Sequence, residues 1–250
     1  MTEFTEQQLE PVWVVIPAAG LGRRMKSDLP KQYLKIHDKC VIEHTLECFL
    51  NHDDIAGIIV VLNPYDSYWK SLNISSRKKP IHTVEGGFDR SDSVLNGLNF
   101  LLKIHEIPVT SWVMVHDAAR PCLSKIDIDS LLELRTQDCV GGILASPVRD
   151  TMKRTKFSET TTGKTETITH TESRDNLCHA LTPQMFRIGE LTEALEFCSE
   201  RNIVITDECS AMEEQRTNPV IVEGSHNNIK ITYPSDLSLA AFLMAQAKVS

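Results

Sequence analysis

The sequence predicts an α/β protein whose mostly parallel, twisted sheet is covered by helices on both faces. Short runs of β-branched and other apolar residues alternate along the chain with segments whose apolar residues recur at helical spacing. Many of the apolar runs end in Gly, Pro or Asn, which mark the points where the chain turns. Strands that alternate with helices form a parallel sheet with helices on both faces.

The individual elements follow from this alternation. The expected strands cover residues 12–16, 57–62, 81–84, 112–115, 140–145, 219–222 and 228–232, and the regular fold resumes at 180–186. The expected helices cover 42–50, 64–72, 90–102 and 190–198, and three more begin at the capping residues Ser124, Thr206 and Ser235. Ile42, Leu46 and Phe49 illustrate the apolar face that each helix turns toward the sheet.

Residues 147–177 interrupt the alternation. Between Thr151 and Thr171 the chain holds nine threonines, and between Lys153 and Asn176 only Phe157 and Ile168 are large and apolar. One interpretation is a surface loop. The other is a β-arm that turns near Gly163 and pairs with a second subunit, and the threonines favour strand over coil. We expect a single domain over 1–250, with 147–177 as a β-arm that forms a homodimer.

Bulk composition excludes several classes of protein. No apolar run approaches the roughly 20 residues that span a bilayer, so we expect no membrane contact. The acidic, polar first ten residues do not resemble a secretory signal. Seven scattered cysteines without a C-x-x-C pair argue against a disulfide framework or zinc site and for a cytoplasmic location. A net charge of −8 argues against nucleic-acid binding.

A glycine turn follows the first expected strand. Residues 17–25 read Pro-Ala-Ala-Gly-Leu-Gly-Arg-Arg-Met, and Pro-Lys-Gln follows at 30–32. Small residues at a strand end let the backbone approach a ligand, and exposed N–H groups there bind anions. With Arg24 and Lys31 nearby, the turn suggests a polyphosphate site, and these two cations are candidates for stabilising a transferring phosphoryl group. The alternative is an ordinary turn with a solvated basic face. Met25, where a third glycine would stand, argues against a dinucleotide.

Asp117 follows another apolar strand and has Ala118 and Ala119 as small neighbours. A lone carboxylate at a strand end suits Mg²⁺, which takes its other ligands from phosphates and water. The alternative is an Asp that caps a turn or pairs with Arg120. His116 could act as a general base, but we prefer a structural histidine that is hydrogen-bonded to the backbone.

Five segments in this order resemble a known family. They are 17–25 with 30–34, 115–121, 147–153, 181–184 and 228–232. Together they make the chain from about Val12 to Met244 resemble the 2-C-methyl-D-erythritol 4-phosphate cytidylyltransferases of the non-mevalonate isoprenoid pathway. The resemblance implies a Rossmann-like nucleotidyltransferase fold and transfer of CMP from CTP to methylerythritol phosphate, with in-line attack of the acceptor phosphate on the α-phosphorus and release of pyrophosphate.

The family's motifs also imply roles for individual residues. Arg24 and Lys31 would stabilise the transition state, and Asp117 would hold Mg²⁺ or another divalent cation. The acceptor would be bound by Thr151, Arg174, Thr206 and Lys230, with Thr151 and Arg174 acting on the partner subunit's site. The nucleotide would be bound by Pro17, Ala18, Ala19, Gly20, Leu21, Gly22, Gly87, Ser93 and Ala118.

Phe88 departs from the family pattern, which often has an acidic residue directly after the two glycines. If a carboxylate there recognises the cytosine amine, that contact is in doubt; if the backbone does so, nothing changes. Three other functions stay open. The first is a ribitol 5-phosphate cytidylyltransferase. The second is a non-catalytic nucleotide-binding protein, although the presence of Arg24, Lys31 and Asp117 together argues against it. The third is an oxidoreductase, which the missing third glycine disfavours.

Overall fold

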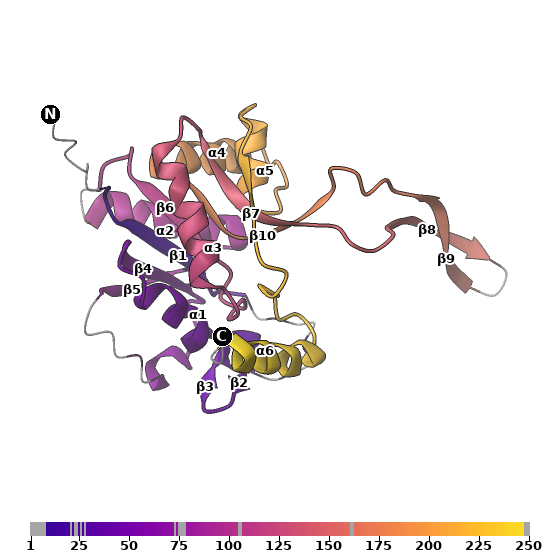
Figure 1. Cartoon of the computed structure of the whole chain (residues 1–250), viewed down its shortest axis with the longest axis horizontal. Helices are drawn as coiled ribbons and strands as arrows, with labels where there is room; N and C mark the ends of the chain where they lie inside the picture. The colour runs from indigo at the N-terminus through magenta and orange to yellow at the C-terminus, as the bar shows by residue number, and fades with distance from the viewer. Residues whose placement is uncertain are drawn as a thin grey trace, which may run out of the picture.

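A seven-stranded sheet forms the centre of the protein in this computed structural model, which describes residues 9–20, 22, 25, 27, 29–72, 74, 79–104, 107–160 and 163–247. Its strand order is β11-β7-β10-β6-β1-β4-β5 (Figure 1). The strands are β1 (Val12–Pro17), β4 (Ile55–Leu62), β5 (Ile81–Glu85), β6 (Trp112–Val115), β7 (Gly141–Pro147), β10 (Cys178–Arg187) and β11 (Val220–Glu223). All neighbours are parallel except at β10, which runs antiparallel to β6 and β7. The prediction of a mostly parallel sheet is confirmed.

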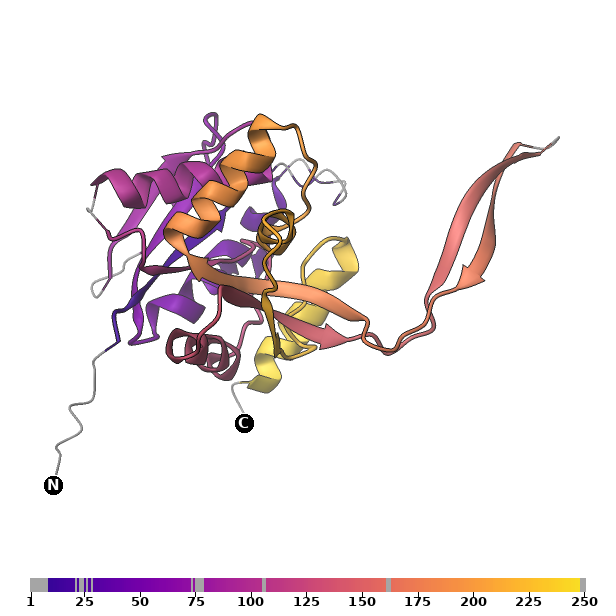
Figure 2. The same cartoon turned by 90° about the horizontal axis from the view of Figure 1, so that it is seen from above.

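Helices cover both faces of the sheet, as predicted (Figure 2). Along β1, Val14 and Ile16 face one core and Val15 faces the other, as side chains alternate along a strand. The first core includes α1 (Val41–Leu50) and α3 (Lys125–Leu132), which continues as the turn η4 (Glu133–Thr136). The second includes α2 (Arg90–Ile104), α4 (Ile188–Glu200) and α5 (Glu208–Glu214).

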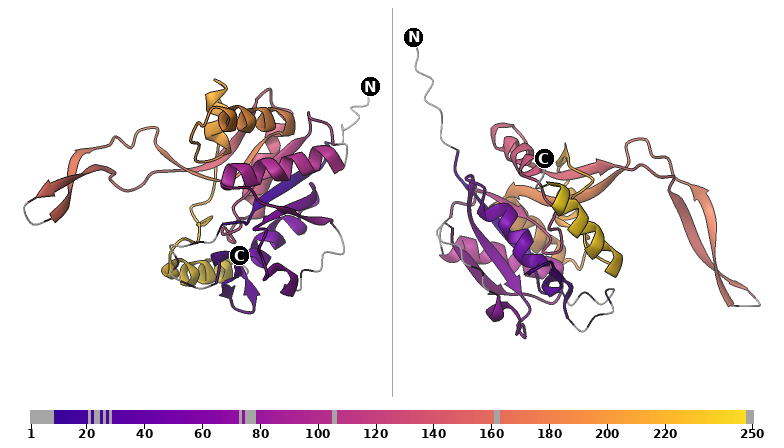
Figure 3. Two further views of the ribbon diagram at one scale, coloured as in Figure 1. Left: turned by 180° about the vertical axis from the view of Figure 1, so that it is seen from behind. Right: turned by 60° about the horizontal axis from the view of Figure 1, so that its bottom comes forward.

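A third, smaller core lies under the last helix, α6 (Pro234–Ala247). This helix packs beside a short hairpin of β2 (Lys35–Ile36) and β3 (Lys39–Cys40), as Figure 3 shows from two sides. The hairpin and the preceding 3₁₀ turn η2 (Lys31–Tyr33) were not predicted, because two-residue strands leave no periodic pattern in a sequence.

Residues 147–177 contain a β-hairpin that projects away from the body of the molecule (Figures 1 and 2). Strand β8 (Lys153–Thr160) pairs antiparallel with β9 (Gly163–Thr171), and every side chain of β9 is exposed. The predicted β-arm is therefore confirmed over the alternative of a structureless loop.

Two predicted elements are wrong. The expected helix over 64–72 contains only the 3₁₀ turn η3 (Trp69–Ser71), because Asn63 and Asp66 side chains accept hydrogen bonds from the backbone N–H groups of the residues that follow them. The expected strand over 228–232 joins no sheet. Its Ile231 N–H donates to the carbonyl of Ala119, which lies in the loop after β6 and not in a strand.

At the start of two helices, a neighbouring aspartate accepts the hydrogen bonds that the predicted capping residue was expected to accept. Asp207, not Thr206, caps α5 and accepts a hydrogen bond from the Ser210 N–H. Helix α6 begins at Pro234, one residue before Ser235, and the carboxylate of Asp236 accepts from the N–H groups before it. The expected cap at Ser124 is confirmed.

Among the described residues, no helix is long and apolar enough to cross a membrane.

Candidate active site

A cavity of about 480 Å³ opens where four neighbouring parallel strands end. Residues directly after β5, β4, β1 and β6 line it, and ligands of open α/β sheets bind at such carboxyl ends. The lining residues are Pro17, Ala18, Ala19, Gly20, Gly22, Lys31, Gln32, Asn63, Gly87, Phe88, Asp89, Arg90, Ser93, Asp117, Ala118, Ala119 and Lys230. The sequence segments that suggested a ligand site thus meet in one place.

The Gln32 side chain holds the glycine turn after β1 by two hydrogen bonds. The Gln32 side chain is buried and its amide donates to the carbonyls of Ala18 at 2.8 Å and Gly20 at 3.3 Å. Gly22 has a φ of +63°, and a Cβ there would lie 3.0 Å from the Lys31 side chain. Lys31 in turn donates through Nζ to the Ile231 carbonyl at 3.0 Å. Sequence analysis assigned no role to Gln32, because its partners become adjacent only when the turn folds.

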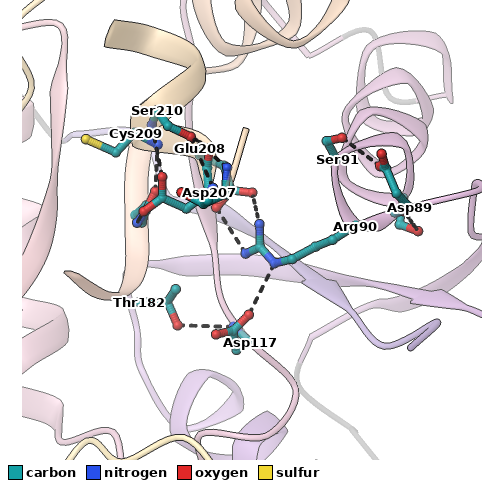
Figure 4. A network of polar contacts seen from close by, with 12 residues as sticks. Asp89, Arg90, Ser91, Asp117, Thr182, Asp207, Glu208, Cys209 and Ser210 are labelled. Carbon is teal, nitrogen blue, oxygen red and sulfur yellow. Dashed lines mark hydrogen bonds and ion pairs between the residues drawn. The ribbon is translucent and has the colours of Figure 1, made fainter. Parts of the chain in front are cut away.

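Asp117 lies among the cations Arg90, Arg120 and Lys230, and Figure 4 shows its contact with Arg90. Its carboxylate oxygens lie 3.3 Å from Arg90 Nε, 3.3 Å from Arg120 Nε and 2.7 Å from Lys230 Nζ. Burial by itself raises the pKa of Asp117, but the charges of Arg90, Lys230 and Arg120 together hold it well below its usual range. The carboxylate is therefore ionised at neutral pH.

Arg90 connects Asp117 to α5 (Figure 4). Its guanidinium forms a bidentate pair with Glu208, with Nη1–Oε1 at 2.6 Å and Nη2–Oε2 at 3.1 Å, while its Nε faces Asp117. Glu208 is only 1% exposed. Burial disfavours the charged form of Arg90, but the two carboxylates outweigh it and raise the arginine pKa. The pair joins residues 118 positions apart, so sequence analysis missed it.

Glu208→Gln is expected to lower the free energy of unfolding by about 2 kcal/mol, because Arg90 loses its main partner while its side chain, 31% exposed, keeps some contact with solvent. The double variant Arg90→Met/Glu208→Met is expected to recover most of that loss, since apolar side chains can replace a buried pair at little cost. Urea unfolding measures both. The exposed Glu214 on the same helix provides the control variant Glu214→Gln. If the free energy of unfolding of the double variant fell by the sum of the losses caused by changing each residue alone, the coupling of Arg90 with Glu208 would be contradicted.

His116 is a structural residue, as preferred from the sequence. It is fully buried, and burial lowers its pKa to about 4, so it is neutral at pH 7. Its Nε2 donates to the Arg120 carbonyl at 3.1 Å, which leaves Nδ1 to accept from the Thr182 hydroxyl at 3.0 Å. The Thr182 oxygen accepts from the Asp117 N–H at 3.1 Å. This chain of hydrogen bonds fixes the backbone that carries Asp117.

Within a single chain, the predicted acceptor-binding residues do not lie together at one place. Only Lys230 lines the cavity. Thr151 and Arg174 are exposed at the base of the arm, where Arg174 donates to the Arg149 carbonyl. Thr206 is exposed just before α5. Leu21 and Arg24 lie outside the described residues, so their placement and roles stay predictions.

The donor groups around Asp117 restrict which metal ion could bind there. No group of three His, Cys, Asp or Glu side chains that could hold a metal ion occurs in the part of the chain that the structure describes. A cation at Asp117 therefore needs ligands from elsewhere. Mg²⁺ meets this condition, because it commonly binds one or two carboxylates and completes its shell with substrate phosphates and water.

The glycine turn, the lysine packed against it and the lone carboxylate at the next strand end define the nucleotidyltransferase class of site. The sequence model of the 2-C-methyl-D-erythritol 4-phosphate cytidylyltransferase family matches residues 12–246. The proteins of that name from Vibrio parahaemolyticus and Alteromonas mediterranea are each 48% identical to the chain, over 94% of its length and 95% and 93% of theirs. The chain therefore belongs to this family, as the sequence motifs indicated.

Solved structures agree with this assignment. A 4-diphosphocytidyl-2C-methyl-D-erythritol synthase is 33% identical, with a TM-score of 0.78 over 94% of this chain and 99% of its own. The 2-C-methyl-D-erythritol 4-phosphate cytidylyltransferase of Francisella tularensis is 37% identical, with a TM-score of 0.76 over 94% of this chain and all of its own. The predicted fold class is confirmed.

Proposed function

We propose that this chain transfers the cytidylyl group of CTP to 2-C-methyl-D-erythritol 4-phosphate, giving 4-diphosphocytidyl-2-C-methyl-D-erythritol and pyrophosphate. Its family membership supports both substrates. The observation that carries the proposal is that the glycine turn, Lys31, Asp117 and Lys230 line the same cavity, which provides backbone donors, cations and a carboxylate for two phosphate-bearing substrates.

The residues of the cavity suit a reaction that depends on position and charge. The acceptor phosphate is already ionised, so its oxygen attacks the α-phosphorus without a strong general base. The neutral, hydrogen-bonded His116 agrees with this, since it has no free nitrogen to offer a substrate. Lys31 and, by resemblance, Arg24 would oppose the negative charge that develops at the α-phosphorus. Lys230 would hold the acceptor phosphate in line for attack.

We infer that Asp117 binds Mg²⁺, or another divalent cation, together with the triphosphate. Such an ion would neutralise phosphate charge and orient the pyrophosphate leaving group. The chain's own part is to keep the Asp117 carboxylate ionised, which Arg90, Arg120 and Lys230 do. It also holds the strand end rigid through Thr182 and His116.

We further infer a homodimer in which the arm of one subunit completes the site of the other. Within one chain, Thr151 and Arg174 do not line the cavity. The arm exposes 73% of Phe157 and 63% of Ile168, and an isolated two-stranded hairpin with exposed apolar side chains is marginally stable in water. A partner that covers these side chains would stabilise the arm.

Mixing two inactive variants tests this arrangement. Lys31→Ala and Arg174→Ala proteins, unfolded together and refolded at equal amounts, are expected to regain about a quarter of the wild-type activity, because half of the dimers are mixed and one of their two sites is intact. The two variants refolded separately provide the control. No recovery, with mixed dimers verified by mass spectrometry, would show that the arm acts on its own subunit.

A second acceptor, ribitol 5-phosphate, is the closest alternative, because it also carries a phosphate on a polyol. Pyrophosphate release measured with CTP and each acceptor in turn decides between them, and we expect turnover with methylerythritol phosphate. Binding of CTP without pyrophosphate release in the presence of either acceptor would support a non-catalytic nucleotide-binding protein.

We also propose a cytoplasmic location. All seven cysteines are free thiols, which supports it.

A further inference from the structure

The most exposed large apolar side chain among the described residues is Phe88, at 101% of its reference surface. It lines the cavity of the candidate active site, although no other side chain covers its ring. Surface apolar residues are common, but an aromatic ring held on the wall of a substrate cavity is placed to contact whatever enters it. The reaction proposed above assigns no role to this ring.

The backbone that carries Phe88 is held from both sides. Gly86 donates to the Leu62 carbonyl at the end of β4 at 2.7 Å. Gly87 donates to Ser93 Oγ and Phe88 donates to Asp92 Oδ2, both at 3.2 Å. A Cβ at Gly87 would lie 2.2 Å from Asp92 Cβ, so the loop packs directly on the first turn of α2. The backbone that brings Phe88 into the cavity lining is therefore held before a ligand binds.

The cavity has two chemically different parts. In one part, Arg90 and Lys230 each form an ion pair with Asp117, and these charged groups suit phosphates. Ala19, Gly87 and Ser93 line the other part. The preceding Gly86 packs closely on it, since a Cβ there would lie 2.6 Å from the Ala19 methyl. This second part offers small side chains and backbone, with the Phe88 ring beside it. A nucleoside triphosphate carries the same division, with charged phosphates at one end and a flat base at the other.

We propose that the Phe88 ring packs against the base of the bound nucleotide and holds it in the cavity. This contact deepens the proposed function and rests on it, because it concerns the CTP of that reaction. Stacking on an aromatic ring strengthens binding but tolerates any base, since every base has a flat π-face. Phe88 then contributes affinity for the nucleotide, while the choice of cytosine depends on directional hydrogen bonds from other groups around the cavity.

Binding measurements on Phe88→Ala test the proposal. The dissociation constant for CTP, measured by titration calorimetry, is expected to rise about thirtyfold, the middle of the range for loss of one base–aromatic contact. The dissociation constant for inorganic tripolyphosphate is expected to stay unchanged, and so is the ratio of CTP to UTP affinities. Phe242→Ala, which removes another exposed ring, on α6, that does not line the cavity, is the control.

The variant Phe88→Trp adds a direct fluorescence signal. Phe88→Trp is expected to keep the CTP affinity, and its additional fluorescence relative to wild type is expected to be quenched by CTP but not by tripolyphosphate. A CTP affinity of Phe88→Ala within twofold of wild type would overturn the proposal, as would an equal loss of tripolyphosphate affinity or a changed dimer content with unchanged CTP binding. If the wild-type protein binds CTP but releases no pyrophosphate with either acceptor, the proposed reaction fails while the contact with Phe88 stands.

Discussion

Alanine at position 31 is expected to lower kcat by roughly a hundred- to a thousandfold, the usual effect of removing one preorganised group that stabilises transition-state charge. Lys31 lines the cavity beside Gly22, and the Ile231 carbonyl fixes its ammonium group at 3.0 Å. Its charge is therefore positioned before the nucleotide binds. Because the negative charge at the α-phosphorus grows only as the acceptor attacks, kcat should fall much more than the affinity for CTP.

Steady-state kinetics on Lys31→Ala, with CTP affinity measured separately, checks this expectation. Lys35→Ala is the matched control, because Lys35 is an exposed lysine of the neighbouring hairpin that does not line the cavity. The fold should survive, since the hydrogen bond from Lys31 to the Ile231 carbonyl is only partly buried and its loss costs little. A raised KM for CTP at an unchanged kcat would mean that Lys31 only binds the nucleotide.

Asparagine at position 117 is expected to abolish turnover at millimolar Mg²⁺ and to lower the affinity for divalent cations by at least about a hundredfold, more than the loss of an outer-shell partner costs. The amide keeps the shape of the carboxylate but removes its charge, and the described residues offer no cluster of other metal ligands. Mn²⁺ binding in the presence of CTP, followed by electron paramagnetic resonance, measures this separately from activity. Asp138→Asn, an exposed position, is the control. Unchanged Mn²⁺ binding would refute the metal role of Asp117.

The same variant should also be less stable, by an amount that depends on pH. Arg90, Arg120 and Lys230 lose their shared anion. Because Arg90 and Lys230 are 31% and 37% exposed, the loss should be about 2–3 kcal/mol, less than the cost of breaking a fully buried pair. The pKa of Asp117 is lowered in the folded state. Its stabilising contribution is therefore complete above the ordinary Asp pKa of about 4 and decreases as the pH falls below it. Urea unfolding at several pH values should show the wild type approaching Asp117→Asn in acid.

Most of the sheet could be predicted because its strands and helices depend on local patterns. Val12–Pro17 and Ile55–Leu62 are continuous apolar runs, and α1 and α2 carry apolar residues at helical spacing. The direction of β10 could not be read from its residues. It follows the arm without a crossover helix, so it returns antiparallel beside β7, and only the path of the whole chain determines that.

The candidate site was predictable where a motif sits at the end of a strand. Gly20, Gly87 and Asp117 each follow a strand of the parallel sheet, and this arrangement brings them to one edge. The residues that hold them were not predictable. Gln32 acts through a turn 12 to 14 positions away, and Glu208 acts through an arginine 118 positions away.

The sequence by itself determined the class of fold, the family and the chemical groups available for catalysis, because short-range periodicity and motif order are encoded in neighbouring residues. Only the tertiary structure decided how those groups are charged and oriented. The low pKa of Asp117, the bidentate pair of Arg90 with Glu208 and the exposed ring of Phe88 depend on distances between segments far apart in the chain. Electrostatic interaction and burial act through space, so they exist only after the sheet has brought these segments together.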